Sequence, residues 1–340
     1  MLTMDVFRNN AFSAVSMSAA VDTMGYVPNF LGSLPGLFVP QPVRTTDIFI
    51  EERGNGPALI QTDERGAPPQ RRGAEKRTVR SFRTLRISQA STIQAHELQN
   101  IRAFGSETEL QQLQVEVARR QLLMRNDVDL TMENMRLGAV QGLVVDADGS
   151  TLFDWAAQFG QTIPAEIDFD LDNAAPASGV VRKLCNSVTR TMLRNLGGLG
   201  GNNVSVVGIC GDDFWDLLTA HPEIRQTYLN TIAAAELREG NAWESFRYGG
   251  ITWINYRGTD DNSKVAVPAS KVKFFPVGAG IFQIAYAPAE RFEFVNTLGQ
   301  QVYSWVVPDK DRDSFVDVEM YSYPLPVCTM PKALHRGKMT

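Results

Sequence analysis

Apolar residues recur at spacings of three, four or seven between residues 106 and 138, and this is the clearest periodic pattern in the 340-residue chain. No proline or glycine interrupts the segment before Gly138, and Ser106 and Glu109 have the spacing of a helix-capping box. The pattern predicts one helix over residues 106–138, about 50 Å long at 1.5 Å per residue. Its apolar positions are Leu110, Leu113, Val117, Met124, Val128 and Met135.

The opposite face of this predicted helix is polar or charged and includes Arg125 and Asp129. We therefore expect a long surface helix that lies across a sheet. A coiled coil is the alternative, although the apolar stripe lapses at Arg120 and Gln121 and again around Thr131.

The remaining elements are shorter and do not alternate regularly. Residues 142–153 have the pattern of a β-hairpin with Asp148 and Gly149 at its turn, and residues 176–196 that of an amphipathic helix stopped by Gly197. We expect Asp212 or Asp213 to cap a helix that runs through 219, and Pro222 to start another towards 239. Strands are expected at 204–209, 251–256, 272–275, 281–286, 302–307 and 315–323. This mixture predicts an α+β fold.

The first 43 residues combine many prolines and glycines with large apolar side chains. Such a segment forms neither a long helix nor a central strand, yet it is too apolar for a solvated linker. It is interpreted as an arm that lies along another surface, either its own or that of a neighbouring copy. Phe30, Leu37 and Phe38 are its candidate contact residues. A surface-packed extension is the plainer alternative.

Residues 44–92 predict an extended basic hairpin. Residues 45–51 and 78–88 have strand composition, and the stretch between Arg65 and Arg86 carries eight Arg or Lys residues against one acid, Glu75. A two-stranded hairpin is marginal alone, so we expect it to dock on an acidic surface of a neighbouring copy. A solvated charged loop is the alternative. The candidate contact residues are Arg71, Arg72, Lys76, Arg77, Arg80, Arg83 and Arg86.

Composition narrows the class of protein. The chain is 44% hydrophobic with a net charge of −5, which suits a folded protein of two or three domains and argues against a dedicated DNA-binding protein. No apolar run of about 18 residues is present, so we expect no membrane span. Three widely spaced cysteines and the lack of a secretory signal pattern indicate a reduced, cytosolic protein.

The candidate chemistry is sparse. Three isolated histidines, His96, His221 and His335, accompany no hydrolase, zinc or phosphate-loop motif. Asp309, Asp311 and Asp313 start like a calcium loop, but the glycine and the final glutamate of that loop are replaced by Ser314 and Met320. The glycine-rich run 197–201 follows a helix instead of a strand, so it does not fit a dinucleotide loop.

We therefore predict a structural protein without catalytic residues, cofactor or metal. The alternative from another class is a hydrolase that uses His221 or the cluster of Asp212, Asp213 and Asp216. Charge at a helix start is the simpler explanation of that cluster.

Several segments resemble one known family in colinear order. One segment, RAFGSETEL, opens the predicted long helix. The next is DLTMENMRLGAVQGLVVDADGSTLFDWAAQFG at 129–160, which begins within that helix. VRTTDIFIEER and RGAPP lie before them, and GGITWINYRG and SYPLPVCTMPKAL after them. In these segments the chain resembles the lambda-type major head proteins, the phage capsid protein E family.

The resemblance implies the tailed-phage major capsid fold of the Hong Kong phage type. Its parts would be an N-terminal arm (1–43), an extended loop (44–92), a peripheral domain (93–165) with a spine helix (106–138), an axial domain (166–290), and return strands of the peripheral domain with a C-terminal tail (291–340). It also implies hexamers and pentamers that form an icosahedral virion shell around double-stranded DNA, assembled in the host cytoplasm. The implied partners are further copies, a portal, a scaffold and a decoration protein, with DNA held by confinement.

An encapsulin-like compartment is the alternative with the same fold. Some relatives in the wider fold crosslink through a loop lysine, but Lys76 is the only lysine of the hairpin and nothing selects it. We therefore expect non-covalent closure of the shell.

Overall fold

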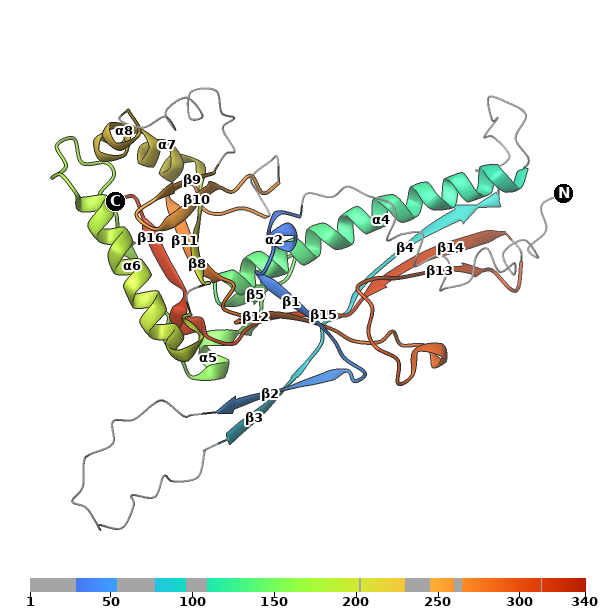
Figure 1. The fold of residues 1–340 in the computed structure, drawn as a ribbon. Coiled ribbons are helices and arrows are strands. Elements are labelled where there is room, and N and C mark those ends of the chain that lie inside the picture. Colours follow the sequence, from blue (N-terminus) through green and yellow to red (C-terminus); the bar gives the residue numbers. More distant parts are fainter. Residues whose placement is uncertain are drawn as a thin grey trace, which may run out of the picture.

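The predicted long helix is present and the other elements are arranged along it (Figure 1). The computed structural model describes residues 29–53, 77–95, 109–201, 203–229, 245–259, 265–312 and 314–340. Helix α4, Glu109–Val140, has 32 residues, so it is about 48 Å long at 1.5 Å per residue. The predicted start at Ser106 lies outside the described residues. The helix continues beyond Gly138, where the backbone of Leu143 comes so close that a Cβ atom would lie 2.3 Å from its carbonyl oxygen.

One face of α4 packs on a sheet of strands β13 (Tyr303–Pro308), β14 (Phe315–Ser322) and β4 (Ile87–Gln94), as expected for a helix lying across a sheet. The buried ridge contains Val117, Met124, Val128, Met132 and Met135. Gln121, which interrupts the apolar stripe in the sequence, is nevertheless buried. Its amide nitrogen donates to the Ser304 hydroxyl oxygen at 2.9 Å, so its polar group has a partner in the core.

The expectation for the opposite face is wrong at two positions. The side chains of Arg125 and Asp129 are 12% and 6% exposed and form an ion pair of 2.6 Å between Nε and Oδ2. They are buried because neighbouring segments cover a second face of the helix, and the pairing of opposite charges lowers the cost of that burial.

A six-stranded sheet occupies the other end of α4. Its strand order is β7, β16, β11, β8, β10, β9. The bounds are β7 Ile167–Asp168, β8 Ser205–Cys210, β9 Ser245–Tyr248, β10 Ile251–Asn255, β11 Lys271–Val277 and β16 His335–Lys338. Helices α6 (Val180–Leu196), α7 (Asp212–Ala220) and α8 (Pro222–Leu229) lie around it (Figure 1). An aromatic cluster of Phe169, Phe214, Trp253 and Phe274 forms part of the core here, with ring centroids 5.3–6.1 Å apart.

Two details of this region differ from expectation. The last residues are not only a tail, because β16 pairs with both β11 and β7. Gly211 occupies the N-cap of α7, so Asp212 and Asp213 lie in the first turn instead of capping it. Their charge is still favourable there, at the positive end of the helix dipole.

A third sheet of β1 (Phe38–Pro42), β12 (Phe282–Tyr286) and β15 (Pro324–Cys328) lies between the other two sheets (Figure 1). The short helix α2 (Phe30–Ser33) precedes β1 and contacts α4. The arm residues 29–42 therefore lie along this subunit's own surface. Leu31 and Leu37 are each 1% exposed, because they insert into its core.

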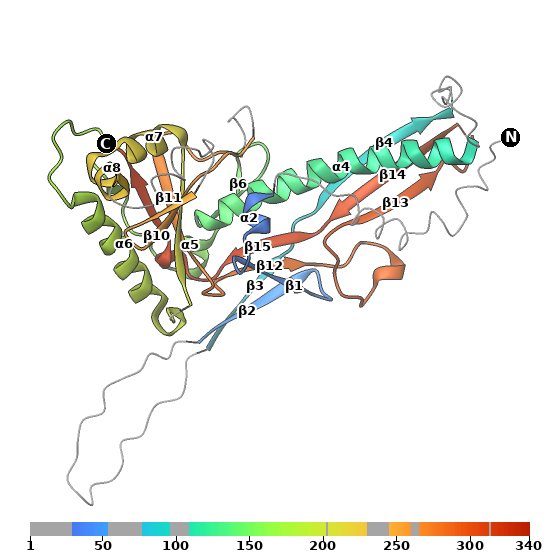
Figure 2. The same ribbon diagram turned by 45° about the horizontal axis from the view of Figure 1, so that its top comes forward.

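Two hairpins complete the described fold. Strands β5 (Leu143–Val145) and β6 (Thr151–Asp154) form the predicted hairpin, with Gly149 at φ 85°, and helix α5 (Trp155–Phe159) follows. Strands β2 (Asp47–Arg53) and β3 (Arg77–Arg83) pair in antiparallel register and project from the body (Figure 2). Strand β3 ends at Arg83 and not at the expected residue 88, because Ile87–Gln94 forms the separate strand β4 and pairs with β14. The division of the chain into domains stays a prediction.

Candidate assembly surfaces

The β2–β3 hairpin is fixed to the body by one of its two faces. Ile48 and Phe82 lie opposite each other in the register and are 8% and 6% exposed. The Phe82 ring packs against the rings of Phe153, Trp155 and Phe159, with centroids 5.2–6.2 Å apart. Side chains alternate between the faces of a strand, so this anchoring fixes which residues point outward.

The outward face of the hairpin carries exposed apolar side chains. Phe49 is 70% exposed and Val79 is 60% exposed. Phe49 pairs with Ser81 and Val79 with Glu51, so the two apolar side chains are diagonal neighbours on one face. Arg77 and Arg83 lie on the same face, at either end of this pair. An apolar patch with a charged rim is typical of a protein contact surface.

The predicted hairpin cations are only partly available to a neighbour. Arg77 pairs with Glu51 at 3.5 Å and Arg86 with Glu290 at 3.4 Å, and Arg86 also lies over the Tyr321 ring. The Arg80 guanidinium donates to the carbonyl oxygen of Gln158. Arg83 is exposed and has no ion pair among the described residues. Arg71, Arg72 and Lys76 lie outside the described residues.

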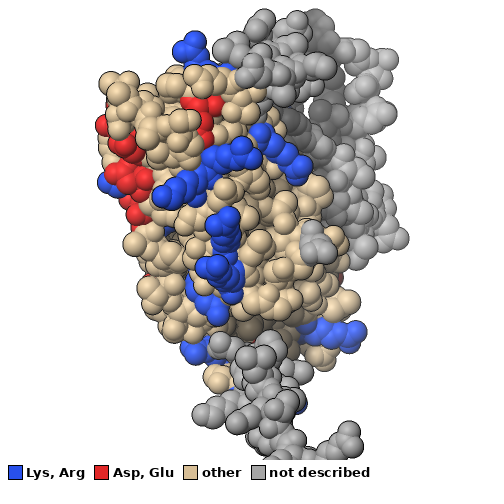
Figure 3. Space-filling model, turned by 60° about the vertical axis from the view of Figure 1, so that its left-hand side comes forward, with Lys and Arg blue, Asp and Glu red and all other residues tan. Residues whose placement is uncertain are grey.

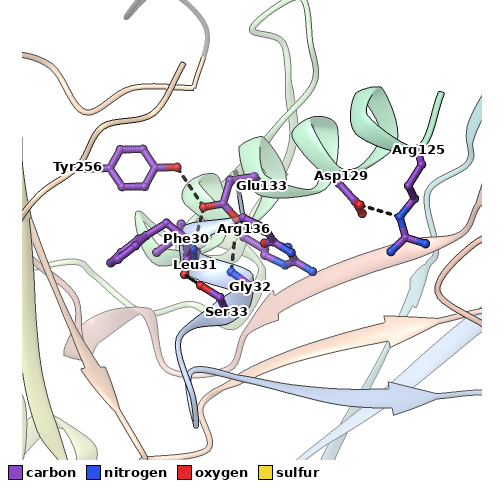
Figure 4. Close-up of polar contacts among 10 residues, drawn as sticks. Phe30, Leu31, Gly32, Ser33, Arg125, Asp129, Glu133, Arg136 and Tyr256 are labelled. Carbon is purple, nitrogen blue, oxygen red and sulfur yellow. Dashed lines mark hydrogen bonds and ion pairs between the residues drawn. The ribbon is translucent and has the colours of Figure 1, made fainter. Parts of the chain in front are cut away.

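The described arm is held by a buried carboxylate of α4 (Figure 4). Glu133 accepts hydrogen bonds from the backbone N–H of Leu31 at 2.7 Å and of Gly32 at 3.4 Å. It also accepts from the Tyr256 hydroxyl at 3.1 Å and pairs with Arg136 at 3.6 Å. Glu133 thus satisfies two N–H groups in the first turn of α2, in the manner of a helix cap supplied by another element.

The surroundings of Glu133 perturb its titration. Burial raises the pKa of Glu133 above its ordinary value, although the N–H of Leu31, the Arg136 guanidinium and the Tyr256 hydroxyl each oppose the shift. Sequence reasoning missed this residue. The spacing of the charges could have revealed it. Arg125 with Asp129 and Glu133 with Arg136 are opposite charges four and three positions apart on one helix, and such neighbours can be buried as ion pairs.

A second exposed apolar surface lies on the loop between β12 and β13, which projects from the body (Figures 1 and 2). Phe292 is fully exposed, and Val295 and Leu298 are 61% and 51% exposed. We call these three residues the apolar knob. Buried Phe294 and a hydrogen bond of 2.9 Å from the Gly299 N–H to the Val43 carbonyl oxygen hold the loop in place. The knob is thus a fixed surface, which lowers the entropy cost of a contact.

The polar residues considered for catalysis lie in ordinary structural settings. His221 and His335 are 4% and 2% exposed, and burial lowers the pKa of each imidazole. Asp212 accepts a hydrogen bond from the Asn255 amide at 3.2 Å, and Asp309 accepts from the Asp311 backbone N–H at 3.0 Å in the turn between β13 and β14. His96 and Asp313 lie outside the described residues.

Within the described ranges, no group of three or more His, Cys, Asp and Glu side chains is placed to hold a metal ion. All three cysteines are buried and unpaired, and burial raises the pKa of Cys185 and of Cys328 to about 12. None of the helices in the described part of the chain is long and apolar enough to cross a membrane.

A long helix across a sheet, a projecting hairpin and a separate mixed sheet with helices make up a fold that solved capsid structures share with this chain at low identity. The capsid of a native GTA particle matches with a TM-score of 0.51 at 11% identity, covering 93% of this chain and 92% of that one. The capsid of cyanophage A-1(L) matches with a TM-score of 0.50 at 13% identity, covering 92% and 93%.

The chain belongs to the phage major capsid protein E family, whose model matches residues 13–339. It is similar to the major capsid protein of Salmonella phage Felix O1, with 29% identity over 350 residues covering 92% of this chain and 91% of the relative. It is also similar to the major capsid protein of Pseudomonas phage KPP10, with 26% identity covering 93% and 95%. The predicted family, fold and function as a tailed-phage major capsid protein are confirmed, and an encapsulin-like compartment is not favoured.

Proposed function

We propose that copies of this chain form hexamers and pentamers that close into an icosahedral shell around double-stranded DNA. The observation that carries this proposal is the outward face of the β2–β3 hairpin. Phe49 and Val79 are exposed there while the opposite face is anchored in the subunit. A neighbouring copy would cover these apolar side chains, and their burial would stabilise the contact by about 25 cal/mol per Å².

Electrostatic contacts would add to this association. Arg83 would meet acidic groups of the neighbour, as would Arg71, Arg72 and Lys76, while Arg77, Arg80 and Arg86 already bond within the subunit. Single exposed ion pairs contribute only about 0–1 kcal/mol. Repeated around a ring, and joined to the apolar contacts, they would hold a closed shell through multivalency.

The apolar knob would make a second contact between copies. Phe292, Val295 and Leu298 are exposed on the loop between β12 and β13, which is far in sequence from the hairpin. Each subunit thus carries two unlike apolar surfaces. Contacts between unlike surfaces of identical subunits can repeat around a ring. Phe30 and Phe38 keep partial exposure on the described arm, whereas Leu37 is buried in its own subunit.

We further propose that the protein acts structurally and not as an enzyme. An open groove of about 290 Å³ at the base of the hairpin is lined mainly by apolar and amide side chains, with Asp47 as a titratable group. That lining lacks the paired acid and base that hydrolysis requires.

We also infer non-covalent closure of the shell and assembly in the host cytoplasm. The partners we infer are a portal, a scaffold and a decoration protein.

The proposal is tested by comparing F49S/V79S with the matched exposed variant L199S. Leu199 is 49% exposed and lies outside both proposed contact surfaces. Negative-stain microscopy should show rings or shells for the wild type and L199S, and unassembled protein for F49S/V79S. Normal shells from F49S/V79S would overturn the role of the hairpin face. A ladder of crosslinked bands from boiled wild-type particles on denaturing gels would overturn non-covalent closure.

A further inference from the structure

Helix α6 presents an exposed face made of cations. Its buried stripe is Val181, Cys185, Val188, Met192 and Leu196. Lys183, Ser187, Arg190 and Arg194 follow one another at steps of four, three and four residues, which places them on the opposite side of the helix. All four are exposed, and we call them the basic stripe. The stripe is about 16 Å long at 1.5 Å per residue.

The charge of this helix is of one sign. Its 17 residues include Arg182, Lys183, Arg190 and Arg194 and no Asp or Glu. None of these four cations forms an ion pair with another described residue. The carboxylate of Glu223, on α8, accepts hydrogen bonds from the backbone N–H groups of Val181 and Arg182 at 3.1 Å each. It therefore caps the start of the helix and does not neutralise the stripe.

The stripe contrasts with the protein as a whole, which has a net charge of −5. Figure 3, which brings the α6 side of the molecule forward, shows Lys and Arg in a band across this face with Asp and Glu gathered along one edge. At physiological ionic strength, charges more than about 8 Å away are largely screened. A ligand at the stripe would therefore respond mainly to the stripe and not to the net charge.

We propose that the basic stripe of α6 binds the phosphate backbone of the DNA enclosed by the shell, without sequence preference. This inference rests on the proposed function, because it assigns the α6 face to the inside of the shell. A duplex carries one negative charge per about 1.7 Å of its axis, so about ten phosphate charges would lie along the stripe. The three cations of the stripe would contact phosphates and displace their counterions.

The composition of the stripe favours a polyanion over an acidic patch of a neighbouring copy. The only side chain between its cations is Ser187, so the exposed ridge has no apolar anchor. The centres of protein interfaces are depleted in charge and enriched in aromatic residues. The hairpin face and the apolar knob have such anchors, with Phe49 70% and Phe292 fully exposed.

The first experiment measures binding of the full-length, unassembled protein to a labelled random-sequence duplex across a salt series. The test variant is K183Q/R190Q/R194Q. The control is R119Q/K310Q/R312Q, which removes the same number of charges from exposed positions on α4 and on the turn between β13 and β14. The slope of log K against log salt should fall in magnitude by about 2–3 for the α6 variant, at about 0.9 per lost phosphate contact, and stay unchanged for the control.

Equal slopes for the α6 variant, the control and the wild type would overturn the proposal. Weaker ring formation by the α6 variant with an unchanged DNA slope would also overturn it, and would assign the stripe to a neighbouring copy. Failure of the wild type to form any shell, with its partner proteins present, would instead contradict the proposed function. The two failures are thus distinguishable.

A second measurement tests whether the basic stripe faces the inside or the outside of the shell. The three native cysteines are buried, so S187C would introduce one accessible thiol in the middle of the stripe. A polymer-linked maleimide too large to enter should leave S187C unlabelled in closed shells and label it after disassembly. Equal labelling before and after disassembly would place the stripe outside and overturn the proposal.

Discussion

The backbone N–H of Leu31 donates to the Glu133 carboxylate at 2.7 Å, across 102 positions of the sequence. This bond joins the described arm to the C-terminal third of helix α4. Tyr256, from the region of the six-stranded sheet, donates to the same oxygen at 3.1 Å. One buried carboxylate therefore connects three parts of the subunit, and its removal should affect all three.

Glu133→Ala should lower the free energy of unfolding by about 3–5 kcal/mol, because it leaves Arg136 as a buried charge without its counterion and orphans the Leu31 N–H. Urea denaturation of the unassembled protein measures the change. Asp127→Ala is the matched control, since Asp127 lies on the same helix but is exposed, and it should cost less than about 1 kcal/mol. Equal losses in the two variants would contradict the role assigned to Glu133.

Stability should also depend on pH through Glu133. Its pKa is raised in the folded state by burial, so between the unfolded value of 4.5 and the raised folded value the folded protein binds more protons than the unfolded one. The proton-linked part of Glu133's contribution to stability is therefore fully present below pH 4.5 and is lost as the pH rises through the folded pKa, while the ionised carboxylate keeps its contacts with Arg136 and Leu31. The difference in unfolding free energy between the wild type and Glu133→Gln should shift in favour of the wild type as the pH falls from 7. A pH-independent difference would contradict this account.

The two faces of the hairpin should respond to substitution in different ways. Phe82→Ala removes a ring packed among Phe153, Trp155 and Phe159, and should cost about 3–5 kcal/mol of unfolding free energy. Phe49→Ala, on the exposed face, should change stability by less than about 0.5 kcal/mol and weaken assembly. Denaturation and sedimentation of both variants separate the effects. A large stability loss from Phe49→Ala would mean that its side chain is covered within the subunit.

The sequence predicts the regular parts of this fold well. The apolar spacing between Val117 and Met135 predicts α4, and strands such as Ser205–Cys210 follow from runs of β-branched residues. It predicts poorly where pairing partners decide the structure. His335–Lys338 has no strand composition, and it becomes a strand because β11 and β7 supply its hydrogen bonds.

Candidate contact residues were predicted by charge and proline content, which cannot tell an inward from an outward side chain. As a result, the predicted contact residues include Leu37, which is buried, and leave out Phe49 and Phe292, which are exposed. Exposure depends on register and on what covers each face, and neither can be obtained from local composition. Glu133 was missed for the same reason, since its partner Leu31 is distant in the chain.

The apolar knob should be needed for assembly and not for folding. F292D/V295D places two charges on a surface that a neighbour would cover, so it should abolish rings and shells while leaving the melting temperature within about 2 °C of the wild type. Leu199→Asp is the control, at a side chain 49% exposed outside the proposed contacts, and should assemble normally. Assembly of both variants would remove the knob from the proposed interface.

Electron microscopy of the wild-type protein expressed alone, across a series of concentrations and salt, tests the central claim most directly. We expect six-membered rings, tubes or closed shells that become more abundant with concentration, because the hairpin face and the apolar knob must both be covered by neighbours. A protein that remains monomeric at every concentration, and also when its neighbouring assembly proteins are supplied, would contradict the account.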